Sequence, residues 1–284
     1  MSDKASWFDR NYFLLRRLHS LSGVVPIGVF LLFHLTTNAS IVWGLMDGRK
    51  AVYGHAGVAT YQSEVGFISR APFLLLTEIF VLWIPIAFHS LLGLYYARTG
   101  KHNAYRYSYQ DNWRYSLQRW SGYVGLLFIF WHVATLRWGW TFLLPGGTKW
   151  DHQFAASTMA AILQGRELAT AADGTTWMLT GAGIAVSLAY LIGVSLLVFH
   201  FANGLWTAAI TWGVTISQAA QRRFGRVCVA VGVLLMLAGW SSVIGFMTLD
   251  QKVARETEVR VLREAPELMD KKEAGDALLG TVAP

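Results

Sequence analysis

The stretch FLLRRLHSLSGVVPIGVFLLFHL, residues 13 to 35, decides the class of fold. Two arginines close a basic head, and the apolar run that begins behind them continues to about residue 45. About 20 apolar residues cross a hydrocarbon core of about 30 Å, so this run predicts a membrane-spanning helix. It is too long for the apolar part of a signal peptide, and no small-residue cleavage site follows. We therefore expect the N-terminal segment to be retained.

Four further apolar runs have the same character. The whole chain of 284 residues is 54% hydrophobic and only 14% charged, whereas soluble domains carry about 25% charged residues. The sequence therefore predicts an all-α integral membrane protein with five transmembrane helices in one domain. A cytoplasmic N-terminal segment is expected at 1–20, the transmembrane domain at 21–248 and a charged C-terminal tail at 249–284. The five expected spans are about 21–45, 72–97, 120–143, 178–205 and 225–248.

The distribution of lysine and arginine sets the expected orientation. With the N-terminus in the cytoplasm, twelve of these residues lie on that side and six in the opposite loops. The tail adds six more outside, but it also carries eight acidic residues. Because cytoplasmic loops are enriched in lysine and arginine, we expect a multi-pass protein with its N-terminus in the cytoplasm and its C-terminus external. Its expected location is the bacterial cytoplasmic (inner) membrane. The same placement explains the net charge of +7 without a nucleic-acid partner.

Several classes of site are excluded by what the sequence lacks. Cys228 is the single cysteine, which rules out a disulfide framework, a cysteine-ligated iron–sulfur cluster and covalent haem attachment. No glycine-rich dinucleotide fingerprint and no phosphate-binding loop occurs, so the chain is not expected to bind nucleotides. Any cofactor must be held by other ligands.

Histidines supply those ligands. Four of the eight histidines lie one per span in the first four apolar runs, and none lies in the fifth: His34, His89, His132 and His200. Ionisable side chains at membrane depth are costly and by default mark function. A single one is as well explained by a hydrogen bond between helices, but four on four helices favour a shared task.

Depth sorts the four histidines into two pairs, because alternate helices run in opposite directions. His34 and His132 lie roughly 20 and 18 Å in from the cytoplasmic ends of their runs. His89 comes late in an inward-running helix, roughly 12 Å from the cytoplasmic edge, and His200 is placed similarly. Two pairs of imidazoles at separate depths fit two stacked haem irons, each with two histidine ligands. The first four helices are thus expected to form a haem-binding bundle.

Other uses of these histidines fit less well. Zinc and copper sites usually gather three or more ligands at one depth, and a proton relay would need more carboxylates than Glu78 within the spans. Gly125 and Gly193 each lie seven residues before a histidine on the same helix face, where a missing side chain would admit a flat ring. Ordinary small-residue helix packing is the alternative for both glycines.

The remaining histidines lie outside these runs. His19 precedes His34 by about 22 Å along a helix and cannot share its iron. Together with Arg16, Arg17 and Ser20 it is a candidate for binding haem propionates or quinone at the cytoplasmic side, the alternative being a simple basic flank. The other three are expected at the surface, and His55 is the one most expected to have a role: His55, His102 and His152.

The strings around these residues resemble a known family. FLLRRLHSLSGVVPIGVFLLFHL, AFHSLLGLYYA, YSYQDNWRYSLQRWSGYVGLLFIFWHV and VFHFANGLWTAAITWGVT, between about residues 10 and 218, resemble the di-haem, five-helix cytochrome b anchor subunit of succinate:quinone oxidoreductases, including fumarate reductases. The resemblance implies that the four histidines are the axial ligands of two haem b (protohaem IX) groups, with His89 and His200 holding the one nearer the cytoplasm. It also implies flavoprotein and iron–sulfur subunits docked on the cytoplasmic face.

Two segments depart from the compact core of that family. The loop 144–177 is expected to form an external cap with a surface helix at about 154–170. The tail 249–284 is expected to begin with a marginal amphipathic helix and to end in a disordered segment.

The expected activity is electron transfer between succinate and a membrane quinone. Electrons would pass from the iron–sulfur subunit through the two haems to quinone near the outer face, or in reverse for fumarate reduction. Quinone reduction consumes two protons, so a proton donor is expected there. Glu64 and Glu78 are the candidates, with Arg70 stabilising negative charge on the quinone. Without such a role, Glu64 would be a solvated loop acid and Glu78 a hydrogen-bonded contact between helices. Arg70 would then anchor its helix at the membrane edge. The di-haem resemblance favours menaquinone over ubiquinone.

Two other classes of protein compete with this interpretation. A quinol-oxidising cytochrome b of another respiratory complex typically carries two histidines 13 or 14 residues apart on each of two helices, and that spacing is absent. A proton-coupled transporter would use buried histidines without a pigment. The absorbance spectrum of the purified chain distinguishes the transporter from a cytochrome.

Overall fold

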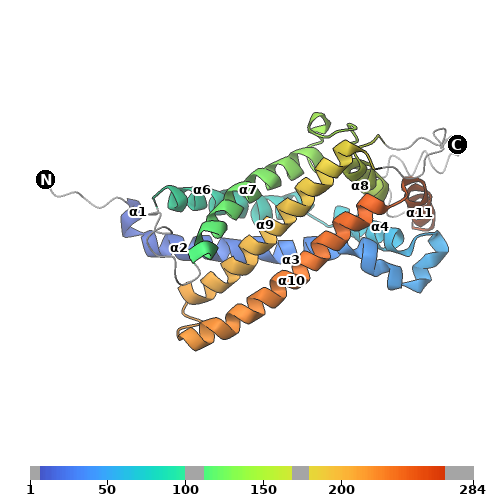
Figure 1. Cartoon of the computed structure of the whole chain (residues 1–284). Coiled ribbons are helices and arrows are strands. Elements are labelled where there is room, and N and C mark those ends of the chain that lie inside the picture. Colours follow the sequence, from blue (N-terminus) through green and yellow to red (C-terminus); the bar gives the residue numbers. More distant parts are fainter. Residues whose placement is uncertain (1–6, 100–111, 168–178, 266–284) are drawn as a thin grey trace. The chain divides into compact units, whose positions relative to one another are not determined.

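The computed structural model describes residues 7–99, 112–167 and 179–265. In these ranges the chain is helical, without strands (Figure 1). The helices are α1 (Trp7–Arg10), α2 (Tyr12–Val24), α3 (Pro26–Trp43), α4 (Ala56–Ser69), α5 (Leu74–Thr77), α6 (Ile84–Thr99), α7 (Asn112–Leu136), α8 (Ala155–Gln164), α9 (Gly181–Thr211), α10 (Gln218–Thr248) and α11 (Gln251–Glu264). A π-helical segment, η3 (Glu78–Trp83), joins α5 to α6, and short 3₁₀ turns are η1 (Gly44–Met46), η2 (Gly48–Tyr53), η4 (Thr141–Leu143) and η5 (His152–Phe154).

Four helical stretches are long and apolar enough to cross a membrane: Tyr12–Met46, Leu74–Thr99, Gly181–Thr211 and Gln218–Thr248. They coincide with four of the five expected spans. The remaining expected span, 120–143, overlaps α7, which is 25 residues long but begins in a polar stretch that includes Arg114 and Arg119. A membrane crossing by α7 remains a prediction.

Proline interrupts two of these stretches. Pro26 has no N–H, so the helical bond to the carbonyl of Ser22 is missing where α2 gives way to α3. Pro85 likewise cannot donate within the first turn of α6, and the preceding turn widens into the π-helical segment that begins at Glu78. Both interruptions leave the stretch helical on either side.

The chain divides into two compact units, each assembled from three separate segments. Unit 1 comprises 1–34, 75–129 and 193–237, and unit 2 comprises 35–74, 130–192 and 238–284. Unit 1 therefore contains α2 and α6 with parts of α7, α9 and α10, whereas α4, α8 and α11 belong entirely to unit 2.

Unit 2 has a buried helix at its centre. Every residue of α8 is buried, and α8 packs against α4 and α11. A helix is present in the region about 154–170, as expected, but the prediction that it lies at the surface is wrong. The sequence AASTMAAILQ explains this, because it combines small side chains with no charged group. The helix expected at the start of the tail is confirmed as α11, whereas residues 266–284, where a disordered end was expected, lie outside the described residues.

A buried glutamate joins α11 to α8. One carboxylate oxygen of Glu258 accepts hydrogen bonds from the backbone N–H groups of Ala156 and Ser157, at 2.7 and 3.0 Å. The other accepts the Ser157 hydroxyl at 2.6 Å. These N–H groups at the start of a helix have no partner within it, and a negative charge there is favourable. Glu258 is 0% exposed, so the tail helix is part of the core of unit 2.

Replacing Glu258 by alanine is expected to loosen this packing. The N–H groups of Ala156 and Ser157 would remain buried without a partner, at a cost of roughly 2–4 kcal/mol. Hydrogen exchange of the α8 amides should therefore accelerate by roughly 30- to 700-fold. Mass spectrometry of the exchanged peptides measures this, and unchanged protection of α8 would contradict the assigned role of Glu258.

The same site gives a pH dependence. Burial raises the pKa of Glu258 from 4.5 to about 7, so between these values the folded chain holds a proton that the unfolded chain has released. Stability of unit 2 should therefore fall as pH rises through this window. Glu258→Gln cannot titrate, so its stability should not depend on pH in this window. Because glutamine still offers an acceptor oxygen, the α8 amides should largely keep the hydrogen-exchange protection that Glu258→Ala loses.

Candidate functional site

Two of the predicted ligand histidines lie close together in unit 1. His89 comes from α6 and His200 from α9; their ring centroids are 6.1 Å apart and their planes are inclined by 80°. The ring of His19, from α2, stacks on that of His89 at 4.0 Å with an angle of 13°. The structure thus brings together the pair predicted from depth and adds a third histidine beside it.

Hydrogen bonds fix the proton on each of the paired imidazoles. Nδ1 of His89 lies 3.0 Å from the carbonyl oxygen of His19, and Nδ1 of His200 lies 3.1 Å from the carbonyl oxygen of Gln118. A carbonyl can only accept, so Nδ1 must carry the proton in both rings. Each Nε2 then has a free lone pair, which is the state that a metal-ligating histidine requires.

The separation of the two rings is compatible with a metal atom that both would bind. Imidazole nitrogens bind metals at about 2 Å, and the 6.1 Å between the ring centroids accommodates one atom between two such nitrogens. Among the described residues, no group of three or more His, Cys, Asp or Glu side chains is placed to hold a metal ion. The chemistry of this donor set is that of a bis-imidazole site.

Two buried polar atoms without partners lie on α2, the helix that contributes His19. Nδ1 of His19 and the hydroxyl of Ser20 are buried and have no hydrogen-bond partner. Arg17 lies over the ring of Trp212 at 5.7 Å, and Arg16 donates to the hydroxyl of Tyr12 at 2.9 Å. These are donors that an acidic group of a bound cofactor would satisfy, so the candidacy of Arg17, His19 and Ser20 stands as a prediction.

The second predicted pair is divided between the units. His34 lies on α3 in unit 1, where its ring stacks on Phe30 at 5.2 Å. His132 lies on α7 in unit 2, with Nδ1 3.3 Å from the hydroxyl of the buried Tyr190. Each ring therefore has an aromatic neighbour in its own unit. The pairing of His34 with His132 remains a prediction.

The predicted glycine openings are filled. A Cβ atom at Gly125 would meet the side chain of Leu197, and one at Gly193 would overlap the ring of Phe128. Both glycines therefore allow close packing of α7 on α9, and the expectation that they admit a flat ring is wrong. The glycines beside the imidazoles are Gly23 and Gly122, as described below.

The quinone-site candidates also fall in different units. Glu64 on α4 and Arg70 at its C-terminal end belong to unit 2, whereas Glu78 belongs to unit 1 as the first residue of the π-helical segment. One carboxylate oxygen of Glu64 is buried without a hydrogen-bond partner. Burial raises the pKa of Glu64, which favours its holding a proton. Nε of Arg70 donates to the carbonyl of Gly66 at 2.9 Å.

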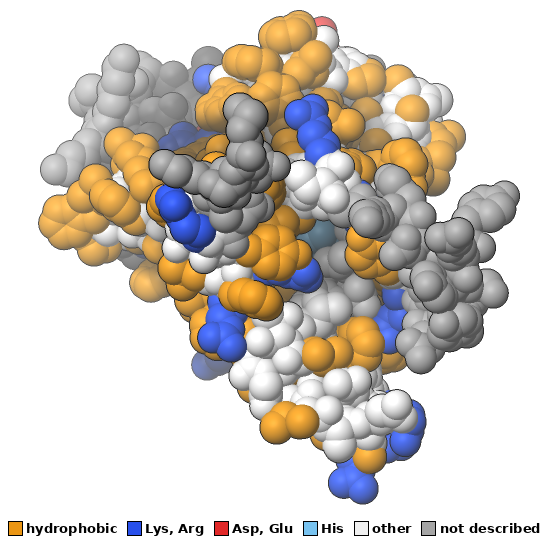
Figure 2. Space-filling model, turned by 90° about the vertical axis from the view of Figure 1, so that its left-hand side faces the viewer, with side chains coloured by type: hydrophobic (Ala, Val, Ile, Leu, Met, Phe, Trp, Pro, Cys, Tyr) orange, Lys and Arg blue, Asp and Glu red, His pale blue; other side chains and the backbone are white. Residues whose placement is uncertain are grey.

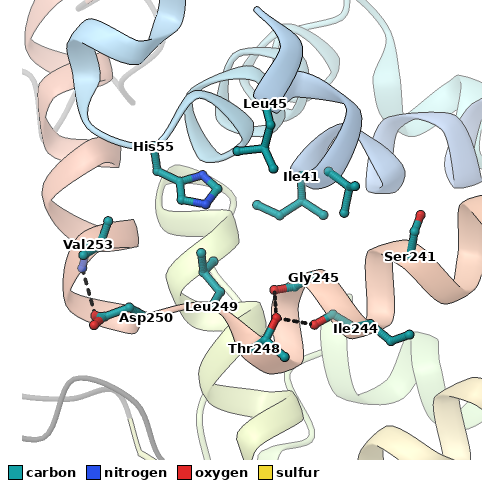
Figure 3. A pocket seen from close by; sticks show the side chains of 11 residues that line it. Ile41, Leu45, His55, Ser241, Ile244, Gly245, Thr248, Leu249, Asp250 and Val253 are labelled. Carbon is teal, nitrogen blue, oxygen red and sulfur yellow. Dashed lines mark hydrogen bonds between the residues drawn. The ribbon is translucent and has the colours of Figure 1, made fainter.

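Unit 2 contains a cavity of about 490 Å³ near the end of α10 (Figure 3). His55, the N-cap of α4, lines it, and its Nδ1 accepts a hydrogen bond from the N–H of Val58 at 3.1 Å. The proton of a neutral His55 is therefore on Nε2. This histidine is partly exposed, as expected for a residue at the surface, whereas His102 lies outside the described residues. The cavity is lined by Ile41, Val42, Leu45, His55, Ser241, Ile244, Gly245, Thr248, Leu249, Asp250 and Val253.

Sequence reasoning missed the hydrogen-bond partners of the predicted ligand histidines. The carbonyl groups of His19 and Gln118 carry no side-chain signature, because any residue supplies a carbonyl. Tyr190 was readable only as one aromatic residue among many in an apolar run. Their roles became visible only once the helices were packed.

Long apolar helices that bring together two imidazoles with free Nε2 lone pairs are the arrangement expected of a membrane cytochrome. Comparison with known proteins identifies the family of cytochromes to which the chain belongs. The chain is 32% identical over 235 residues to the succinate dehydrogenase cytochrome b558 subunit of Bacillus subtilis (strain 168), and the match covers 83% of this chain and 97% of that protein. The chain belongs to the family of succinate dehydrogenase cytochrome b subunits and is a membrane-anchor cytochrome b of succinate:quinone oxidoreductase. No family model matched the chain, and no solved structure matched it.

Proposed function

We propose that this subunit passes electrons between an iron–sulfur partner and membrane quinone through two haem b groups, each held by two histidines. The observation that supports this proposal most strongly is the pair His89 and His200. Backbone carbonyls accept the Nδ1 protons of both rings, which leaves both Nε2 lone pairs free. Bound haem supplies one-electron chemistry. The protein supplies the axial imidazoles, their orientation and a buried setting that sets the potential.

We further propose that His34 and His132 hold the second haem. His132 is oriented by Tyr190, at 3.3 Å between Nδ1 and the hydroxyl oxygen, and His34 by its stacking on Phe30. These contacts restrain the orientation of the two imidazole rings, as expected for histidines that must point a nitrogen at a metal. Arg17, His19 and Ser20 are proposed to bind the propionates of the haem nearer the cytoplasm.

The proposed partners follow from orientation. Figure 2 shows one face of the molecule, on which lysine and arginine side chains stand among hydrophobic ones and acidic side chains are scarce. Arg222, Arg223 and Arg226 line an open cavity of about 540 Å³ in unit 1. A basic helix end supports a cytoplasmic location for the N-terminus and an external C-terminus. The flavoprotein and iron–sulfur subunits are then proposed to dock on the cytoplasmic side.

Quinone is proposed to react at the opposite, outer side of the membrane. Glu64 supports this because its buried, unpartnered carboxylate oxygen and raised pKa suit a proton carrier. Glu78 opens a π-helical segment, a feature frequent at functional sites. Arg70 would stabilise negative charge. The cavity beside His55 offers an imidazole N–H within an apolar lining. Menaquinone is the proposed substrate, as the di-haem type favours.

The location of the quinone site gives a prediction. Glu64→Gln and Glu78→Gln should leave both haem spectra and dye-linked succinate oxidation nearly intact, because neither residue is a proposed ligand. At least one of them should slow quinone turnover by roughly 10²-fold, as expected when a positioned proton donor is lost. The ratio of quinone-linked to dye-linked activity measures the effect.

His19→Ala tests the competing location at the cytoplasmic side. Full quinone activity in both glutamate variants, combined with a deep loss in a His19→Ala variant whose two haem spectra are intact, would place the quinone site there. That result would also remove the transmembrane electron path from the proposed function.

A further inference from the structure

The surroundings of His89 and His200 repeat in detail. The hydroxyl oxygen of Ser22 lies 3.3 Å from Nδ1 of His89, and that of Ser121 lies 3.2 Å from Nδ1 of His200. Ser22 also donates to the carbonyl of His19 at 2.8 Å, and Ser121 donates to the carbonyl of Gln118 at 3.0 Å. In each half, serine therefore bonds to the same carbonyl that accepts the imidazole proton.

Glycines complete the repeat. A Cβ atom at Gly23 would lie 2.6 Å from Cε1 of His89, and one at Gly122 would lie 3.1 Å from Cε1 of His200. The sequence pattern behind this is Leu-x-x-x-Ser-Gly, which occurs at 18–23 and again at 117–122. One turn of helix thus presents a carbonyl, a hydroxyl and an open face to each imidazole.

We propose that Ser22 and Ser121 are positioning residues that set the strength of the two axial ligands, in two copies of one socket. This inference rests on the proposed function, since it requires His89 and His200 to bind one haem iron. The socket comprises Ser22 and Gly23 with the His19 carbonyl for His89, and Ser121 and Gly122 with the Gln118 carbonyl for His200.

The hydrogen-bond directions give the socket its effect. Each serine proton points to the carbonyl, so a lone pair of its oxygen faces the Nδ1–H, which is shared between carbonyl and hydroxyl. A second acceptor on Nδ1–H makes the imidazole more basic. A more basic axial ligand favours the oxidised iron and lowers the reduction potential. Both serines are buried, at 9% and 0% exposure, so water does not replace the lost acceptor.

A merely structural role is the alternative, because serine hydroxyls commonly bond to a carbonyl in the preceding turn. Ser242 makes that bond alone: it is buried, donates to the carbonyl of Gly239 at 2.8 Å, and belongs to unit 2. Ser242→Ala therefore removes the same serine-to-carbonyl hydrogen bond within a helix, outside the unit that contains the two imidazoles, and serves as the matched control.

Redox titration of the whole complex tests the proposal. Ser22→Ala and Ser121→Ala should each raise the midpoint potential of one and the same haem and leave the other unchanged. Loss of an outer partner of a ligand typically costs 10- to 100-fold in metal affinity or activity. Each tenfold part of such a loss that falls on the oxidised state alone corresponds to about 59 mV. Ser22→Thr and Ser121→Thr, which keep a hydroxyl, should return the potential towards the original value. Loss of that haem in the alanine variants with recovery in the threonine variants supports the proposal equally.

Other results would overturn it. Unchanged potentials in both alanine variants, or shifts no larger than that of Ser242→Ala, would reduce the serines to helix packing. An upward shift of a different haem in each variant would show that the sockets do not serve one iron. A wild-type complex that carries no haem would instead refute the proposed function, so the two failures are distinguishable.

The glycines give a second, independent readout. Gly23→Ala should displace its imidazole more than Gly122→Ala, because the added atom would lie 2.6 Å rather than 3.1 Å from the ring. Haem content per chain, measured at equal levels of membrane-inserted protein, should therefore fall further in Gly23→Ala. Equal and full haem content in both variants would contradict the socket.

Discussion

Replacing either His89 or His200 by alanine is expected to remove the same haem, the one closer to the iron–sulfur partner. Their ring centroids lie 6.1 Å apart and both imidazoles are proposed to bind the same iron, so neither can bind it normally without the other. Since electrons would enter through this haem, quinone-linked succinate oxidation should fall by on the order of 100-fold or more, beyond the effect of losing an outer partner of a ligand. Dye-linked oxidation should persist, because the dicarboxylate site lies in another subunit.

His34→Ala and His132→Ala should disturb the other haem. Redox titration followed by absorbance separates the two components in each variant. His152→Ala is the matched control, because this imidazole lies in unit 2, with Nδ1 3.8 Å from a carboxylate oxygen of Asp151, and is not a proposed haem ligand, so its loss should leave both haems in place. If loss of His34 and loss of His89 removed the same spectral component, the sorting of the four histidines by depth would be wrong.

The sequence was most informative where one physical constraint dominates. Apolar runs long enough to cross a bilayer predicted four of the helical stretches that the structure contains. The cost of placing imidazoles among apolar residues singled out four histidines, and their depth paired His89 with His200, whose ring centroids lie 6.1 Å apart. Both inferences need only the local pattern and the direction of each helix.

Prediction failed where the outcome depends on packing between distant segments. The sequence around 154–170 was interpreted as a surface helix, but α8 is buried because α4 and α11 cover it. Glu258 looked like one charge among many in a polar tail. Its carboxylate is buried only because the N–H groups at the start of α8 satisfy it. Such pairings join residues about 100 positions apart and leave no periodic signal.

The glycines show the same distinction. Spacing of seven residues from a histidine singled out Gly125 and Gly193, but Leu197 and Phe128 occupy those faces. Gly23 and Gly122 lie beside imidazoles of other helices. A glycine's neighbour across a helix interface is fixed by the packing of two helices and cannot be derived from spacing on one.

The second large expectation concerns the number of haems. Four histidines on four helices, of which two lie 6.1 Å apart with free Nε2 lone pairs, predict two low-spin protohaems per chain. Cys228 is the single cysteine, so neither haem can be tethered covalently through two thioethers. Acidic acetone should therefore extract both completely and leave the polypeptide colourless.

Haem stoichiometry in the purified complex tests the central claim most directly. Extracted protohaem is quantified as its pyridine adduct and divided by the amount of this chain, determined by amino-acid analysis after separation of the subunits. The account predicts two protohaems per chain, with one remaining in His89→Ala. A ratio of one in the wild-type complex would contradict the assignment of two pairs of histidine ligands, as would haem that stays with the polypeptide after extraction.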